Sequence, residues 1–208
     1  MVQPLSYLKE TPSQTAGPYV HIGTNPNWVE ITGVYEKDLG LVLVGPQAKG
    51  ERILIEGQLF DGAGSPVRDA LIEIWQADAD GLHASPKETR GTADPDFTGW
   101  GRLPTDEKDG SFRFETVKPG VVPLPDGRRQ APHVTVWIAA RGINVGLHTR
   151  LYFEDEAEAN AADPLLQRIP EPARRDTLIA KRSMRDGLTV YRFDIRLQGD
   201  GETVFLDI

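Results

Sequence analysis

The sequence predicts a mainly β protein, a β-sandwich of mixed topology with a long N-terminal arm and a short helical insertion. Six Asp-Gly dipeptides predict tight turns, because both residues tolerate positive φ angles. Short runs with strand character lie between these turns, and their spacing suits a sandwich better than a βαβ fold. The dipeptides begin at Asp61, Asp80, Asp109, Asp126, Asp186 and Asp200.

Residues 1–50 differ in composition from the rest of the chain. Pro and Gly are scattered from Thr11 to Pro18, a stretch that includes Thr15 and Gly17. This composition is typical of an extended segment laid on a surface. We therefore expect residues 1–50 to form an arm, packed on the domain and on a partner, and residues 51–208 to form the β-sandwich of a single domain.

Alternation of apolar and polar residues indicates the strands. In the run 189–197, Tyr191 and Phe193 share one face while Arg192 shares the other, as in a strand with one wet side. The strands expected in chain order are 52–60, 70–75, 111–117, 133–139, 148–153, 189–197 and 203–206.

The run 133–139 separates two kinds of residue. Val134 and Val136 form an apolar face, and His133 and Thr135 project to the opposite side. We therefore expect this strand to carry polar side chains behind the core.

Helix is expected only from Asp155 to about Lys181, where an Ala-rich and Glu-rich sequence is interrupted by three prolines. The prolines predict two short helices in place of one long helix. Asp155, Glu156 and Glu158 are expected to cap the first helix, because acidic groups favour the positive end of the helix macrodipole.

Composition excludes several kinds of function. The 208 residues contain no cysteine, so disulfides, thiolate metal sites and thiol nucleophiles are excluded. No apolar run approaches the length of a membrane span, and the first residues show no secretory leader. A cytoplasmic protein is therefore expected. With 31 acidic residues against 23 Lys and Arg, the net charge is −8, which disfavours nucleic acid as a partner. A small anionic substrate would need a local cation.

Seven segments, in this order, resemble the intradiol ring-cleaving dioxygenases, β-sandwich proteins that open catechols between the two hydroxyl carbons. The last two narrow the resemblance to the α chains of family members that work as αβ pairs. The segments are 11–19, 61–80 around Glu73-Ile74-Trp75-Gln76, 116–120 with Lys118-Pro119-Gly120, 131–135, 140–144 together with 147–153, 177–182 and 191–196.

In the iron-bearing members of this family, two Tyr and two His bind a ferric ion, and the His pair is arranged His-x-His on one strand. Residues at i and i+2 share a face, so both imidazoles can reach one metal, and phenolates suit high-valent iron. Here the matching tripeptide is His133-Val134-Thr135, so a hydroxyl replaces one imidazole.

Neither Tyr of the family is retained. Val121-Val122 follows the Lys-Pro-Gly turn where one Tyr is expected, and Leu82 or His83 replaces the other. With three of four ligands missing, we expect no metal on this chain, and His133 should be a hydrogen-bonded interior histidine. The resemblance places Fe(III) on a homologous β partner chain.

The resemblance also implies a role beside the partner's site. Thr15, Gly17 and Arg141 would face that site and shape the substrate entrance, and none would be catalytic. The assembled enzyme would insert both atoms of O2 into protocatechuate to give β-carboxy-cis,cis-muconate, without an organic cofactor, and this chain alone would be inactive. Arg128 and Arg129 precede His133 near the place of a family Arg, but the loop length differs, so that role is not transferred.

Two other functions fit parts of the sequence. An isolated β-sandwich of transthyretin-like type, acting as a binding module, would explain Asp61 to Asp80 but not the arm or the helical insertion. A self-sufficient dioxygenase with an altered ligand set would be coloured by phenolate-to-iron charge transfer, whereas an isolated binding module would not.

Overall fold

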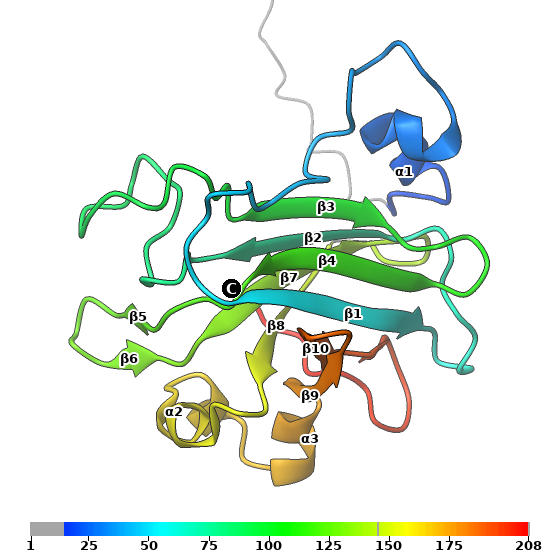
Figure 1. Ribbon diagram of the computed structural model, residues 1–208. Helices are drawn as coiled ribbons and strands as arrows, with labels where there is room; N and C mark the ends of the chain where they lie inside the picture. The colour runs from blue at the N-terminus through cyan, green and yellow to red at the C-terminus, as the bar shows by residue number, and fades with distance from the viewer. Residues whose placement is uncertain (1–14, 145, 208) are drawn as a thin grey trace, which may run out of the picture.

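The computed structural model describes residues 15–144 and 146–207, which form a mainly β protein with a few short helices, as the sequence predicts (Figure 1). The first part of the expected arm, residues 1–14, lies outside the described residues. The strands are β1 (Arg52–Phe60), β2 (Leu71–Gln76), β3 (Trp100–Pro104), β4 (Ser111–Val117), β5 (Val122–Pro123), β6 (Arg129–Gln130), β7 (His133–Ala139), β8 (Leu147–Phe153), β9 (Ile179–Arg185), β10 (Leu188–Arg192) and β11 (Ile195–Arg196).

Nine of these strands form one mixed sheet that curls on itself. Its order is β11-β1-β10-β9-β8-β7-β2-β3, with β4 paired to β1, and β5 and β6 make a separate hairpin. Gln76 of β2 links the two ends of the curled sheet by bonding to β4. Its side-chain amide donates to the Val117 carbonyl at 2.9 Å and accepts from Thr116 Oγ1 at 2.9 Å. The strands therefore enclose a core between two layers.

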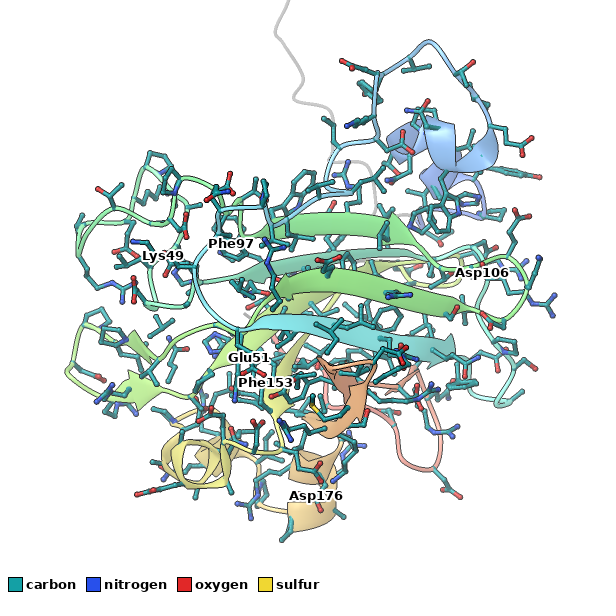
Figure 2. All side chains as sticks on the ribbon, in the orientation of Figure 1. Lys49, Glu51, Phe97, Asp106, Phe153 and Asp176 are labelled. Atoms are coloured by element: carbon teal, nitrogen blue, oxygen red, sulfur yellow. The ribbon has the colours of Figure 1, made fainter. Side chains whose placement is uncertain are left out.

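The core confirms the two expected apolar faces. Val134 and Val136 of β7 pack in the same cluster as Tyr191 and Phe193, whereas Arg192 is exposed. Phe153, labelled in Figure 2, meets Tyr191 edge-on with 4.7 Å between ring centroids. The expected strands 52–60, 111–117 and 133–139 are observed with the same bounds.

The run 189–197 is not one strand. β10 and β11 both pair in parallel with β1, but the ladder is interrupted at Phe193 and Asp194. There the Asp194 carboxylate accepts the Gln58 N–H at 3.0 Å, in place of a backbone acceptor. Residues 203–206 also form no strand, only an isolated bridge between Leu206 and His148.

Four strands were not predicted: β3, β9 and the two short strands of the β5–β6 hairpin. β3 pairs with β2, although Gly101 and Pro104 weaken its strand signal. β9 begins at Ile179, where helix was expected, and pairs with β10 through a two-residue turn. Asp186 and Gly187 both have positive φ, 53° and 81°, as such a hairpin requires.

The helical insertion consists of α2 (Ala157–Ala162), a 3₁₀ turn η2 (Leu166–Arg168) and α3 (Pro172–Asp176), which lie together at the bottom of Figure 1. The capping prediction is confirmed in part: Glu156 is the N-cap residue of α2 and Glu158 lies in its first turn, but no side chain makes a cap hydrogen bond. The carboxylates of Asp155 and Glu156 pair with Lys118 Nζ instead, at 2.8 and 2.7 Å.

Helix is not confined to this insertion. The arm region contains α1 (Val20–Thr24) and a 3₁₀ turn η1 (Pro26–Val29), at the opposite end of the molecule from α2 in Figure 1. Within the described ranges, no helix has the length and hydropathy needed to cross a membrane.

Candidate functional site

His133 and Thr135, two of the positions that match the family's iron ligands, lie on the outer face of the sheet formed by β2, β7 and β8. Trp75, Thr135 and Arg150 are cross-strand neighbours in register, and His133 is paired with Tyr152. Paired residues in an antiparallel sheet point to the same side, so these side chains lie on the side of the sheet that faces away from the core. The outer face of β7 is therefore polar, as its alternation predicts.

The structure selects His83 over Leu82 as the residue at this face. The His83 ring stacks on Trp75 with 5.8 Å between centroids and 18° between planes, whereas Leu82 packs against Gly91. Val122 is buried and pairs with Gln130 in the β5–β6 hairpin. We call His83, Val122, His133 and Thr135 the four ligand positions.

His133 is an interior histidine, which confirms the sequence-based expectation. It is 7% exposed, and its Nδ1 lies 2.7 Å from the Ala131 carbonyl, so Nδ1 donates and Nε2 carries the lone pair. Burial, together with the Arg150 cation, lowers the pKa of His133 to about 4. The imidazole is therefore neutral at pH 7.

Tyr152, which the sequence analysis did not single out, adds a phenol at this face. Its hydroxyl donates to Asp163 Oδ1 at 3.2 Å. Burial raises the pKa of Tyr152, and the Asp163 carboxylate acts in the same direction. Tyr152 therefore stays protonated and does not supply a phenolate.

A guanidinium lies among the four ligand positions. Arg150 faces Thr135 across the sheet, and its Nη1 donates to Gln130 Oε1 at 2.7 Å. Its positive charge acts to lower the pKa of both His133 and His83, for which burial is the larger cause. A fixed cation beside neutral imidazoles opposes the binding of another cation.

These residues do not fit a ferric ion. Such an ion favours hard anionic donors, but the four ligand positions offer two imidazoles, one hydroxyl and an apolar side chain. Over residues 15–144 and 146–207, no group of three or more His, Cys, Asp or Glu could hold a metal. The donors present therefore do not match the two Tyr and two His of the iron-bearing members.

Thr15, Gly17 and Arg141 meet at the opposite end of β7. Thr15 Oγ1 donates to the Ala140 carbonyl at 3.1 Å and accepts the Gly142 N–H at 2.9 Å, while the Gly17 N–H lies 3.4 Å from the same oxygen. Thr15 therefore fastens the arm to the loop that carries Arg141.

Arg141 is held by a carboxylate that the sequence analysis missed. Its Nε lies 3.0 Å from Asp69 Oδ2, and the Arg141 side chain is 66% exposed against 16% for Asp69. The guanidinium is thus oriented yet open to solvent, and able to meet an anion from outside. No local sequence pattern links Asp69 to Arg141, because they are 72 residues apart (141 − 69) and only the folded chain brings them together.

Comparison with known proteins supports the resemblance. A sequence model of a family described as dioxygenase matches residues 24–199. The chain is 50% identical over 206 residues to the protocatechuate 3,4-dioxygenase alpha chain of Pseudomonas putida, covering 98% of this chain and 99% of that one. It is 37% identical over 162 residues to the protocatechuate 3,4-dioxygenase beta chain of Burkholderia cepacia, covering 74% of this chain and 67% of that one.

A solved structure has the same fold. The dioxygenase domain of a dioxygenase and carbohydrate-binding protein fusion from Streptomyces sp. SirexAA-E superposes with a TM-score of 0.57 at 27% identity, covering 81% of this chain and 95% of that one. The β-sandwich is therefore a dioxygenase fold, and a binding module of another family is not needed to explain it.

Proposed function

The chain belongs to the intradiol ring-cleaving dioxygenase family, and we propose that it is an iron-free α subunit of a protocatechuate 3,4-dioxygenase. It would act only together with a homologous β subunit that carries Fe(III). The similarity to an alpha chain over nearly the full length of both proteins supports this assignment, as does the weaker similarity to a beta chain.

The observation that carries the proposal is the replacement of the ligand set. Thr135 and Val122 stand where the family has His and Tyr, and Arg150 adds a positive charge beside them. A self-sufficient dioxygenase is disfavoured for the same reason. Ring cleavage, with both atoms of O2 entering protocatechuate to give β-carboxy-cis,cis-muconate, would take place at the iron that the β subunit supplies.

Exposed apolar residues in the arm region support a partner there. Among the described residues, the exposed large hydrophobic side chains all lie between residues 19 and 42, apart from Met184. Such a concentration is characteristic of a protein interface. The members are Tyr19, Trp28, Ile31, Val34, Tyr35, Leu39, Leu41 and Val42, which we call the arm patch.

Arg141, with Thr15 and Gly17, would complete the substrate entrance of the partner. A chain with a net charge of −8 repels an anionic substrate unless a local cation offsets its field. The exposed guanidinium, oriented by Asp69, can offer planar donors to a carboxylate. The role would be binding, with no part in the oxygen chemistry.

The proposal is tested by metal analysis of two preparations. The chain is purified alone and, separately, after co-expression with an iron-bearing homologue. We expect far less than one iron per chain alone, and one iron per αβ pair with a visible absorption band in the complex. One tightly held ferric ion per chain alone would refute the proposal.

A further inference from the structure

A hollow of about 410 Å³ lies between the β5–β6 hairpin and the segment that follows α2. None of its lining residues is acidic, although the chain as a whole carries a net charge of −8. Three guanidinium groups around one concave surface create a local positive potential. The polar lining residues are Arg128, Gln130, Arg150 and Arg168, and Leu124 and Leu165 are among the apolar ones.

Arg150 has unused donor capacity at this hollow. Its Nη1 is held by Gln130, but its Nε is buried without a hydrogen-bond partner in the described part of the chain. Neither Arg150 nor Arg168 forms an ion pair with a carboxylate of residues 15–144 or 146–207, whereas Arg128 pairs with Asp126 at 2.6 Å. The positive charges of Arg150 and Arg168 are therefore not neutralised by an ion pair within the described residues, so an anionic oxygen in the hollow would be attracted to them.

The carboxylate of Asp163, next to the hollow, opposes this positive potential. Asp163 is fully buried and adjoins the lining of the hollow through Pro164. Its two oxygens already accept from four donors, the N–H groups of Ala131, Leu165 and Leu166 and the hydroxyl of Tyr152, at 2.9 to 3.2 Å. Asp163 therefore has its own partners and does not neutralise Arg150 by direct contact.

We propose that this hollow binds a small molecule through a carboxylate or phosphate group, with Arg150 and Arg168 as the principal donors. Guanidinium groups bind both kinds of oxyanion in a forked geometry, and the volume falls in the range of small-molecule sites. The hollow adjoins the four ligand positions through Arg150, which faces Thr135 across the sheet, but none of those four residues lines it. The site is separate from Arg141, which follows the other end of β7.

The test uses the full chain and its complex with the iron-bearing subunit. Phenylglyoxal modification of arginines is mapped by peptide mass spectrometry, with and without inorganic phosphate or benzoate. We expect either anion to slow modification of Arg150 and Arg168 at least threefold, and to leave Arg113, an exposed arginine on β4, unchanged. This readout locates the site, so anion binding near the partner's iron does not interfere.

Calorimetric titration of three variants of the chain with inorganic phosphate or benzoate provides a second measurement. We expect Arg168→Gln and Arg150→Gln to weaken binding at least tenfold, and Arg113→Gln to leave it unchanged. Arg168 is exposed, so its substitution should not disturb folding. Protection by phosphate but not benzoate assigns a phosphate ligand, and the reverse assigns a carboxylate. The proposal would be overturned if the anions changed the modification rates of Arg150, Arg168 and Arg113 equally. It would also be overturned if anion binding were unchanged in Arg168→Gln.

Discussion

Arg141 Nε lies 3.0 Å from Asp69 Oδ2, so a largely buried carboxylate orients an exposed guanidinium at the end of β7. Such an arrangement reduces the conformational entropy that Arg141 would lose on binding an anion. It also predicts that Asp69 acts on substrate binding only through Arg141.

Arg141→Ala should raise the KM of the αβ enzyme for protocatechuate about two- to fivefold at low salt. Because Arg141 is two-thirds exposed, the lost interaction is worth about 0–1 kcal/mol, and the effect should fade as salt screens it. The kcat should change less, since uniform binding is removed. Steady-state kinetics at two ionic strengths measure this, with Arg113→Ala as control. An unchanged KM at low salt would exclude the role.

Asp69→Asn should raise KM less than Arg141→Ala does, because the guanidinium remains but is no longer held. In the double variant the two effects should not add, since Asp69 has nothing to orient once Arg141 is gone. A double-mutant cycle on KM measures the coupling. Strict additivity would show that the two residues act independently.

Substitutions in the arm patch should weaken assembly without unfolding the chain. Val34→Asp and Val42→Asp each place a charge on a side chain that is 58% or 64% exposed, so folding should be little affected. Recovery of the αβ complex by size exclusion should fall at least tenfold. Met184→Asp, an exposed apolar side chain outside the arm patch, is the matched control. Equal loss with Met184→Asp would contradict a specific interface.

His133 should make stability pH-dependent in the acid range. Its pKa is lowered to about 4 by burial, against about 6.5 in an unfolded chain, so the unfolded state binds more protons between these values. The free energy of unfolding should therefore fall as pH drops from 6.5 towards 4, by up to about 3 kcal/mol.

Urea unfolding across this range should show a shallower decline for His133→Gln than for the unaltered chain. His148→Gln, which removes a partly exposed imidazole from the neighbouring strand, controls for the loss of a histidine. The same slope in His133→Gln and the unaltered chain would assign the acid sensitivity to other groups.

Much of the fold follows from local patterns. The bounds of β1, β4 and β7 could be predicted because side-chain direction alternates along a strand, so burial of one face is written into the order of residues. β9 could also have been predicted, since Asp186-Gly187 is a signal for a two-residue hairpin turn between two strands. The composition of the preceding segment favoured helix instead.

Residue identity is enough to show which donors the four ligand positions lack, because Thr135 and Val122 are not His and Tyr. That Arg150 faces Thr135, and that Asp69 holds Arg141, is known only from the folded chain. The register between β7 and β8 and the contact across 72 residues (141 − 69) depend on how distant segments pack. Alternation within one strand carries no information about which residue of another strand it will face.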